Sequence, residues 1–482
     1  MALSDSASDD LSTQEMARSS QSTRLALLVA SAFFMEFLDG TVIATALPDM
    51  AKAFGVPAID LNIGISAYLL TLAVLIPANG WIAERFGARL IFTSAISIFT
   101  IASLFCGLTH SVTSFVLMRI LQGVGGAMMV PVGRLVVLQS TPKNQLIKAI
   151  ALLTWPGLVA PIIGPPLGGF ITTYASWHWI FFLNIPLGLI AIFLSLKLMP
   201  QSSVAEKRPF DWGGFGLTGV AMLSLVAGLE MFSQQDMTLV EAVAVLVIGM
   251  TALWFSLRHL KRCQTPLIQL KALSIPSFKI MMRGGFILRT TISSAPFMLP
   301  LMFQVGFGMN AFQAGSLVLA VFAGNFAMKP ATTRLIHYFG FRKLLIGNGV
   351  VCVLSLFLCA FLTPDSPQFW TLLLLFIGGL SRSMEFTGIS SLAFADVPAP
   401  LMNSANTLFS TSLQLASGLG ITLGALSIRI GAYASNQLGY GVLPGAGFRF
   451  GFIVIAILTA IGVYDMTRLK RNAGATVLNK SH

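Results

Sequence analysis

The chain has 482 residues, of which 55% are hydrophobic and only 10% are charged. Soluble proteins carry about a quarter charged residues, so this composition excludes an ordinary soluble enzyme or nucleic-acid-binding domain. The formal net charge is +12, but the Lys and Arg residues lie in alternate loops between apolar runs. This is the positive-inside pattern of membrane proteins, so it predicts two cytoplasmic termini and indicates no nucleic-acid partner.

In chain order, residues 1–23 are polar and Ser-rich and lack a basic start, so we expect a disordered cytoplasmic tail and no signal peptide. Apolar runs of about 20 residues then recur, each long enough to cross a bilayer as a helix. They predict an all-α polytopic membrane protein with about fourteen transmembrane helices, near residues 24–46, 61–83, 90–108, 114–138, 147–173, 179–198, 213–232, 238–257, 280–304, 313–333, 343–363, 368–394, 404–430 and 448–468.

These helices divide into two bundles with a pair between them. We expect an N-terminal six-helix bundle over 24–200, an inserted two-helix segment over 201–265, a C-terminal six-helix bundle over 266–470 and a cytoplasmic tail over 471–482.

An internal repeat supports this division. Each half contains two Phe-Gly pairs 32 residues apart, and the offset of 253 residues between the halves also relates Arg89 to Arg342. Two bundles related by pseudo-twofold symmetry are typical of transporters, whose substrate path runs between the halves near the membrane midplane. The pairs are Phe54-Gly55, Phe86-Gly87, Phe307-Gly308 and Phe339-Gly340.

Two acids interrupt the first span, just before and within the stretch LDGTVIATALP (38–48). Charge at membrane depth is costly and usually functional, and an enclosed carboxylate can take up and release a proton near neutral pH. We therefore expect Asp39 to couple protons or bind a cation. Glu36, one helical turn earlier on the same face, could share the proton, contact a cationic substrate or hydrogen-bond a neighbouring helix.

Three further patterns in the first half carry glycines or a buried cation. The loop GWIAERFGAR (80–89) lets two helices turn closely, and we expect its acid, Glu84, to pair with Arg134. The segment RILQGVGG (119–126) places Arg119 before small residues that allow close helix approach, and a permanent cation there can stabilise ionised Asp39. In the fifth span, GPPLGG (164–169) is a kink-prone segment.

The second half contributes candidate residues for a substrate cavity. Arg382 and Glu385 have the i,i+3 spacing of a helical ion pair, and we expect them to pair, with Glu385 contacting a cationic substrate as the alternative. Arg289 and Lys329 either extend toward lipid headgroups or face the cavity. The candidate cavity residues are Glu36, Arg289, Arg382 and Glu385.

The sequence lacks the residue patterns of metal binding, disulfide formation, ATP binding and enzymatic catalysis. The five histidines show no metal-ligand spacing, the four cysteines no paired spacing, and no phosphate-binding loop for ATP is present. No catalytic Ser/His/Asp or Cys/His grouping stands out. We therefore expect no enzymatic activity, no cofactor and no metal.

Taken together, these motifs resemble the major facilitator superfamily, specifically its fourteen-span drug:proton antiporter branch, over essentially the whole chain. The resemblance implies proton coupling by Asp39 and Arg119. It also implies a gating loop (Gly80, Arg85, Gly87 and Arg89) and an antiporter signature (Gly164, Pro165, Gly168 and Gly169). This chain departs from the pattern at Glu84, Ala88, Ala151, Ala160 and His178, where the family usually has Asp, a basic residue, two glycines and Arg.

We expect a monomeric exporter in the bacterial inner membrane that exchanges lipophilic, cationic drugs or metabolites for protons by alternating access. Its partners are then the small-molecule substrate, protons and membrane lipids. The alternative is a proton-coupled importer or facilitator of a polar or anionic solute on the same fold. A third hypothesis is a membrane sensor or scaffold that transports nothing.

Overall fold

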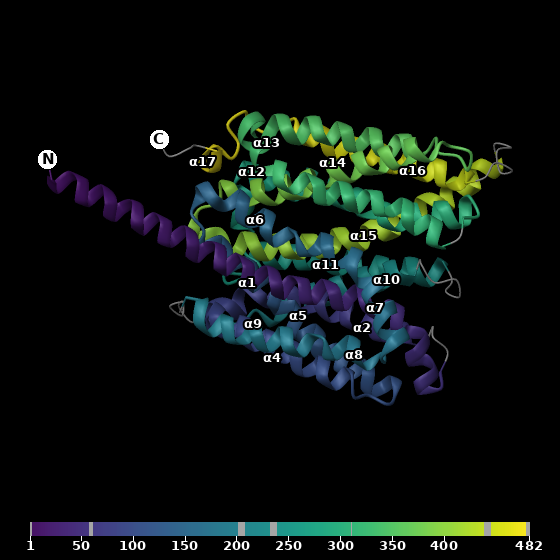
Figure 1. Cartoon of the computed structure of the whole chain (residues 1–482), viewed down its shortest axis with the longest axis horizontal. Coiled ribbons are helices and arrows are strands. Elements are labelled where there is room, and N and C mark those ends of the chain that lie inside the picture. Colours follow the sequence, from purple (N-terminus) through teal and green to yellow (C-terminus); the bar gives the residue numbers. More distant parts are fainter. Residues whose placement is uncertain are drawn as a thin grey trace. The chain divides into compact units, whose positions relative to one another are not determined.

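The computed structural model describes residues 2–56, 61–200, 208–231, 239–309, 311–437 and 445–478. Every regular element within these ranges is a helix (Figure 1), so the all-α prediction is confirmed for the part of the chain described. Eleven of the helical segments are long and apolar enough to cross a membrane. The chain is therefore a multi-pass membrane protein, as its apolar runs predict.

Two compact units make up the fold. The N-terminal unit contains Met1–Leu75 and Asn79–Arg208, and the C-terminal unit contains Ile76–Ala78 and Pro209–Leu478. The inserted helix pair expected over 201–265 thus contributes its helices to the C-terminal unit.

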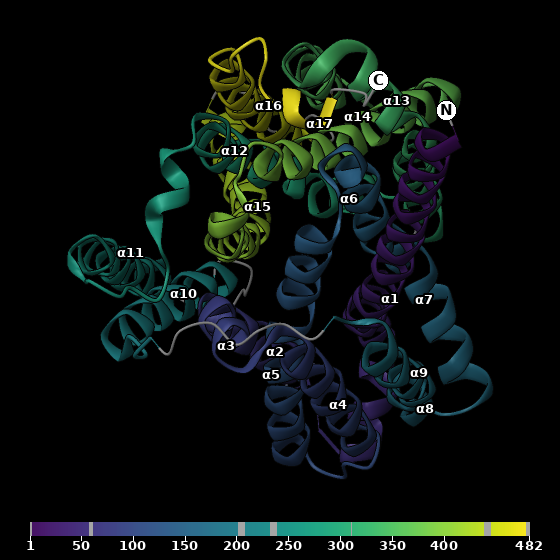
Figure 2. The ribbon, with the colours of Figure 1, turned by 90° about the vertical axis from the view of Figure 1, so that its left-hand side faces the viewer.

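The N-terminal unit is organised around α1 and α5. α1 packs against α5, α7 and α9, while α2 and α4 both pack against α5 (Figure 2). Apolar side chains of α1, α5 and α8, among them Leu38, Phe115 and Phe181, form its buried core. Its helices are α1 (Ala2–Phe54), α2 (Asn62–Leu75), α3 (Asn79–Phe86), α4 (Ala88–Cys106), α5 (Val112–Ser140), α6 (Leu146–Thr154), α7 (Pro156–Tyr174), α8 (His178–Phe182) and α9 (Asn184–Leu198).

The N-terminal tail differs from our expectation. Residues 1–23 were expected to be disordered, but α1 begins at Ala2 and continues without a break into the first span. No Gly or Pro occurs between Ala2 and Arg24, so no helix-breaking residue separates this polar segment from the apolar one.

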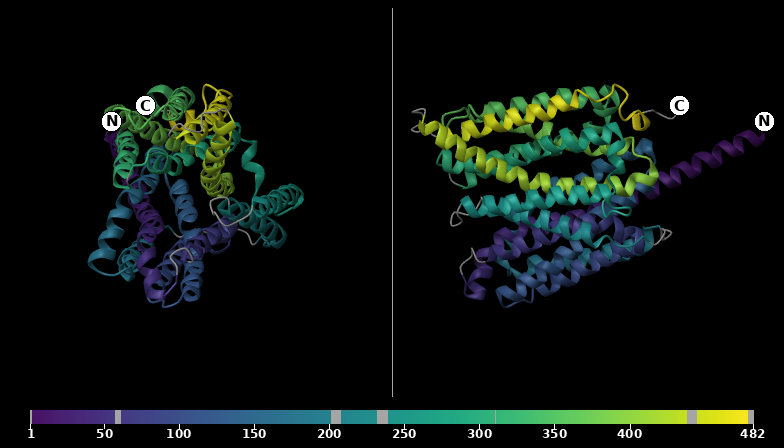
Figure 3. Two further views of the ribbon diagram at one scale, coloured as in Figure 1. Left: turned by 90° about the vertical axis from the view of Figure 1, so that its right-hand side faces the viewer. Right: turned by 180° about the vertical axis from the view of Figure 1, so that it is seen from behind.

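The C-terminal unit is built around α12, α13 and α14. α12 packs against α15 and α16, and α13 packs against α14 and α16 (Figure 3, green and yellow). Its core includes Met298, Phe303 and Phe452. Its helices are α10 (Trp212–Met231), α11 (Leu239–Arg262), α12 (Pro276–Leu301), α13 (Ala311–Cys359), α14 (Gln368–Ala395), α15 (Met402–Gln437), α16 (Ala446–Met466) and α17 (Ala475–Leu478).

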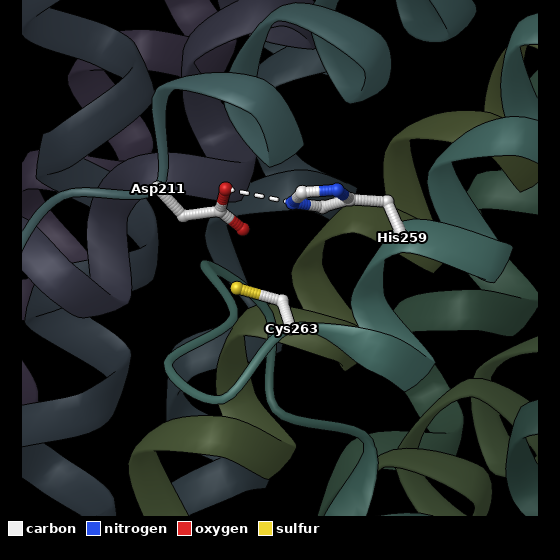
Figure 4. Close-up of side chains that lie close together, drawn as sticks. All are labelled: Asp211, His259 and Cys263. Carbon is white, nitrogen blue, oxygen red and sulfur yellow. Dashed lines mark hydrogen bonds and ion pairs between the residues drawn. The ribbon is translucent and has the colours of Figure 1, made fainter.

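The helix pair α10 and α11 is fastened at one end by Asp211 (Figure 4). Its Oδ1 accepts hydrogen bonds from the Gly214 N–H and from His259 Nε2, both at 2.8 Å, and its Oδ2 accepts from the Leu267 N–H at 3.1 Å. Burial acts to raise the pKa of Asp211, but these hydrogen bonds outweigh it and hold the pKa below its usual range. One carboxylate thus caps α10 and ties it to the end of α11.

The internal repeat is visible in the backbone. All four glycines of the repeated Phe-Gly pairs have positive φ: Gly55 at 69°, Gly87 at 86°, Gly308 at 70° and Gly340 at 73°. Gly340 divides α13 into two helices, just as Gly87 separates α3 from α4. Only glycine adopts this conformation freely, which explains why the same residue occupies equivalent turns.

The arginines of the repeat also make equivalent contacts. Arg89 Nη2 donates to the Leu196 carbonyl in the last turn of α9. Arg342 Nη2 donates to the Thr467 carbonyl, at the end of α16, at 3.0 Å. Each arginine therefore ties the turn in its own unit to the end of that unit's last long helix.

Candidate functional site

Asp39 lies within a buried polar cluster of the N-terminal unit. Arg119 Nη1 donates to its Oδ2 at 2.7 Å, while Gln122 Nε2 and Asn184 Nδ2 donate to its Oδ1 at 2.9 and 3.1 Å. The side chains of Asp39 and Arg119 are both 0% exposed. The carboxylate thus accepts from three N–H donors, one of which belongs to a cation.

Ser103 and Gln122 complete the cluster. Gln122 Oε1 accepts from Arg119 Nη1, which orients the amide so that Nε2 faces Asp39 and Ser103. Ser103 Oγ accepts from Gln122 at 2.8 Å and from Asn184 at 3.3 Å. Residues of α1, α4, α5 and α9 thus share one network, and a change in the charge of Asp39 affects four helices.

Arg119 is held on its other side by α2. Its Nε donates to the Gly64 carbonyl at 3.4 Å, and its guanidinium carbon lies 4.4 Å from the centre of the Tyr68 ring. Its Nη2 is buried without a hydrogen-bond partner among the described residues. The guanidinium therefore depends on Asp39 for its charge partner, because no second carboxylate is bonded to it in this part of the chain.

Small residues allow the helices of the cluster to approach. A Cβ added at Gly125 would lie 2.7 Å from the Ala95 carbonyl of α4, so α5 and α4 touch through their backbones. A Cβ at Gly164 would lie 2.3 Å from Thr41 Oγ1, which donates to the Ala160 carbonyl. α7 thus contacts α1 directly, two residues beyond Asp39.

The remaining residues of the Gly-Pro segment lie on the same helix. α7 continues from Pro156 to Tyr174 through Gly164, Pro165, Gly168 and Gly169. Gly168 is buried, whereas a Cβ at Gly169 would meet nothing within 4 Å. The small size of Gly164 therefore permits the close approach of α7 to α1, whereas Gly169 plays no such part.

Glu36 faces a different neighbour from Asp39. One of its oxygens, Oε2, is buried and has no hydrogen-bond partner among the described residues. Glu36 interacts electrostatically with Asp39 and with Arg134, whose guanidinium carbon lies 5.8 Å from the centre of the Phe33 ring. α5 therefore places a cation near each acid of α1, Arg119 at Asp39 and Arg134 near Glu36.

The loop between α3 and α4 is tied to the segment that follows the N-terminal bundle. Glu84 forms an ion pair with Arg208, and Trp81 Nε1 donates to the Arg208 carbonyl at 3.1 Å. Gly80 is buried, Arg85 is half-buried, and Gly87 and Arg89 form the turn described above. The sequence carries no signal that pairs Arg208 with Glu84, because the two residues are 124 positions apart in the chain. The expected contact of Glu84 with Arg134 stays a prediction.

The expected Arg382–Glu385 pair does not form. Glu385, which is 0% exposed, accepts from Asn348 Nδ2 at 3.0 Å through Oε1. The guanidinium carbon of Arg382 instead lies 5.3 Å from the centre of the Phe386 ring. Spacing of i,i+3 permits a pair, but here the acid faces α13 and the arginine extends along α14.

Sequence reasoning also missed Gln122, Asn184 and Ser103. The signal was present in part, because Gln122 lies three residues after Arg119 and therefore on the same face of α5. Asn184 and Ser103 carry no such signal, since their contact with Asp39 depends on how α9 and α4 are rotated in the bundle.

One group of side chains could offer ligand atoms to a metal ion. The ligand atoms of Asp211, His259 and Cys263 all lie within 4.8 Å of one another (Figure 4). The capping of α10 and the bond to His259 already account for the position of Asp211. We therefore regard the group as a structural fastening of α10 and α11.

A buried acid–base pair that joins several membrane-spanning helices is typical of membrane transporters. A sequence model described as Major Facilitator Superfamily matches residues 29–421. The chain therefore belongs to the Major Facilitator Superfamily.

Relatives and solved structures agree with this assignment. The "Putative multidrug resistance protein MdtD" of Escherichia coli (strain 55989 / EAEC) is 35% identical over 459 residues, which cover 95% of this chain and 97% of that protein. The protein of the same description from Enterobacter sp. (strain 638) is 35% identical over 94% of this chain and 95% of its own length.

Two solved structures share the fold. The human organic anion transporter MFSD10 has a TM-score of 0.66 at 16% identity, over 92% of this chain and 99% of its own. The proton:xylose symporter XylE has a TM-score of 0.64 at 14% identity, over 95% of this chain and 98% of its own.

Proposed function

We propose that this protein is a proton-coupled antiporter that exports lipophilic drugs or metabolites across the bacterial inner membrane as a monomer. The single observation that carries the proposal is the enclosed pair of Asp39 and Arg119, with Gln122 and Asn184 as further donors. A carboxylate buried in a membrane span can bind and release a proton, and few other roles repay its cost.

The proposed step is the binding and release of one proton at the carboxylate of Asp39. A proton that binds a carboxylate oxygen of Asp39 neutralises it and removes the ion pair with Arg119. In the ionised state, four helices are held by one network. In the protonated state, the guanidinium must find other acceptors, so protonation favours a second conformation. This is a population shift driven by the different proton affinities of the two states.

Glu36 extends the proton site. It lies one turn from Asp39, interacts with it electrostatically and has a buried oxygen without a hydrogen-bond partner among the described residues. Two carboxylates this close do not ionise independently. We propose that the pair shares one exchangeable proton, with Arg134 favouring the charge on Glu36 while Arg119 favours it on Asp39.

Further observations support an exporter of the fourteen-span branch. The division of α13 at Gly340, the apolar helix α10, and the segment of α6 and α7 at the fifth expected span each add one span to the eleven candidates. We therefore propose fourteen spans with both termini in the cytoplasm. The relatives named for multidrug resistance match nearly the full chain. Contact between Gly164 and Thr41 joins the antiporter signature to the helix that carries Asp39.

A second candidate is a facilitator or importer of a polar or anionic solute. The observation that favours it is the set of three cations in the C-terminal unit, Arg289, Lys329 and Arg382. These residues bear on the charge of the cargo. They do not bear on the direction of transport, for which Asp39 and the α7 glycines support exchange.

Inside-out vesicles of an efflux-deficient bacterial host expressing the protein provide the test. The vesicles are acidified by respiration, and cargo candidates that include cations, acids and neutral biocides are added while a pH-sensitive dye reports on the lumen. We expect a saturable, cargo-dependent release of protons that vesicles without the protein lack. Cargo uptake into these vesicles with no proton release would contradict the antiporter and favour the facilitator.

A further inference from the structure

One face of α14 gathers cations from three helices. Arg382, Phe386 and Ser390 are spaced four residues apart, so their side chains follow one stripe of the helix. Arg289 of α12 and Lys329 of α13 reach the same stripe. All of these residues lie within the C-terminal unit.

Arg289 is fixed by hydrogen bonds and by two aromatic rings. Its Nη2 donates to Ser390 Oγ at 2.7 Å and to the Phe386 carbonyl at 3.4 Å. Its guanidinium carbon lies 5.2 Å from the centre of the Phe386 ring and 5.0 Å from that of Phe409. These hydrogen bonds and the two rings orient the guanidinium along the stripe of α14.

Arg382 and Lys329 place two further positive charges on this stripe. The guanidinium carbon of Arg382 lies 5.3 Å from the same Phe386 ring, and its Nε and Nη1 are buried without hydrogen-bond partners among the described residues. Lys329 Nζ donates to Thr387 Oγ1 at 3.0 Å. Two arginines therefore share one ring as a neighbour, and a lysine is held by the next residue of α14.

The acid of this segment faces elsewhere. Glu385 is 0% exposed and accepts from Asn348 of α13, so it does not bond to the arginine three residues before it. Two buried donor atoms of Arg382 are thereby left for a ligand. Guanidinium groups bind carboxylates through paired N–H donors, and an ammonium group adds a point charge.

We propose that Arg289, Lys329 and Arg382 form an anion subsite that binds the carboxylate groups of the transported molecule, with Phe386 contacting its apolar part. The subsite rests on the proposed export function and specifies its cargo as an organic anion. It replaces the cationic cargo that we expect from the sequence. Of the two acids considered as partners for such a cargo, Glu385 is enclosed and bonded to Asn348, and Glu36 belongs to the proposed proton site.

Binding of benzene-1,3,5-tricarboxylate to the purified full chain tests the subsite. Benzyltrimethylammonium serves as the cationic probe of similar size. The protein is held in nanodiscs of phosphatidylcholine alone, and affinities are measured by equilibrium dialysis with labelled probes. We expect the tricarboxylate to bind and Arg382→Gln, Lys329→Gln and Arg289→Gln each to weaken it roughly tenfold or more.

Two further variants make the result specific. Arg382→Lys keeps the positive charge and should recover part of the lost affinity. Arg258→Gln is the matched control, because Arg258 also lies over an aromatic ring, 5.4 Å from the centre of Trp254, on α11; it should bind as the unaltered protein does. Thermal unfolding of each variant identifies any that fail to fold. If Arg382→Gln is among them, the tricarboxylate affinity of Arg382→Lys is compared with that of the unaltered protein instead.

Several outcomes would overturn the subsite. One is a folded Arg382→Gln variant with unchanged tricarboxylate affinity, and another is preferential binding of benzyltrimethylammonium. Displacement of the tricarboxylate by phosphatidylglycerol added to the nanodiscs would assign the cations to a lipid headgroup instead.

Vesicle transport separates this proposal from the export function. If cationic cargo drives proton release, and Arg382→Gln, Lys329→Gln and Arg289→Gln leave that release unchanged, the subsite is refuted and proton coupling stands. Tricarboxylate flux that depends on Arg382 but moves no protons supports the subsite and refutes the antiporter.

Discussion

Arg119 Nη1 and Asp39 Oδ2 are 2.7 Å apart, and neither side chain is exposed to solvent. α5 supplies the cation and α1 the acid, while Gln122 and Asn184 both donate to the other carboxylate oxygen, Oδ1. Such a pair is stable only while both charges are present, because removal of either leaves the other buried without a partner. The pair is therefore suited to a switch that responds to one proton.

The first prediction concerns the cation of this pair. Arg119→Ala leaves the carboxylate of Asp39 enclosed with only amide donors, so we expect it to destabilise the protein by about 3–5 kcal/mol if Asp39 stays ionised. A double variant, Arg119→Ala with Asp39→Asn, should be more stable than Arg119→Ala alone. Thermal unfolding in detergent measures both. Equal destabilisation in the single and double variants would show that the two charges are not coupled.

A second prediction concerns helix approach at α7. Gly164→Ala places a methyl group 2.3 Å from Thr41 Oγ1 and should force α7 away from α1. We expect reduced transport and a stability loss of about 1–3 kcal/mol, typical of overpacking. Gly347→Ala on α13 is the control, since a Cβ there meets nothing within 4 Å. If both variants behave alike, contact between α7 and α1 does not depend on Gly164.

The ion pair between Glu84 and Arg208 provides a third prediction. Its side chains are 29% and 35% exposed, so solvent screening limits its contribution to about 0.2–1 kcal/mol. Glu84→Gln should therefore leave stability nearly unchanged. If this loop gates transport, the same variant should change the transport rate, and exchange to Glu84→Arg with Arg208→Glu should restore part of it. Unchanged rates in both variants would remove the loop from the gating role.

Much of this fold follows from the apolar runs, because a span must form all its backbone hydrogen bonds internally and can do so as a helix. The contact of Asp39 with Arg119 also follows from two charges that must avoid lipid. Asn184 and Ser103 could not be assigned to the site, because their contact depends on helix rotation. The expected pair of Arg382 with Glu385 was wrong, because Asn348 and Phe386 offered each side chain another partner.

A fourth prediction concerns the pH dependence of stability that arises from Asp211, the residue that joins α10 to the end of α11. The pKa of Asp211 is lowered in the folded protein, mainly by the hydrogen bonds that overcome its burial. A depressed carboxyl pKa contributes stability above its unfolded value, near 3.8, and this contribution is lost as pH falls through the lower folded value. Asp211→Asn keeps one acceptor oxygen but loses the charge and the second acceptor oxygen, so it should cost about 1 kcal/mol at pH 7, as loss of one hydrogen bond does.

Unfolding temperatures measured from pH 7 down to pH 3 check this prediction. The difference between the unaltered protein and Asp211→Asn should be constant down to about pH 4 and should shrink below it. A difference that does not depend on pH would mean that the charge of Asp211 contributes nothing.

The central claim is that Asp39 carries the proton that drives transport, and cargo-dependent proton release from inside-out vesicles tests it most directly. Asp39→Asn keeps the size of the side chain and one acceptor oxygen but cannot exchange a proton. We predict that this variant inserts and binds cargo yet releases no protons when cargo is added. Proton release by Asp39→Asn at the rate of the unaltered protein would contradict the account.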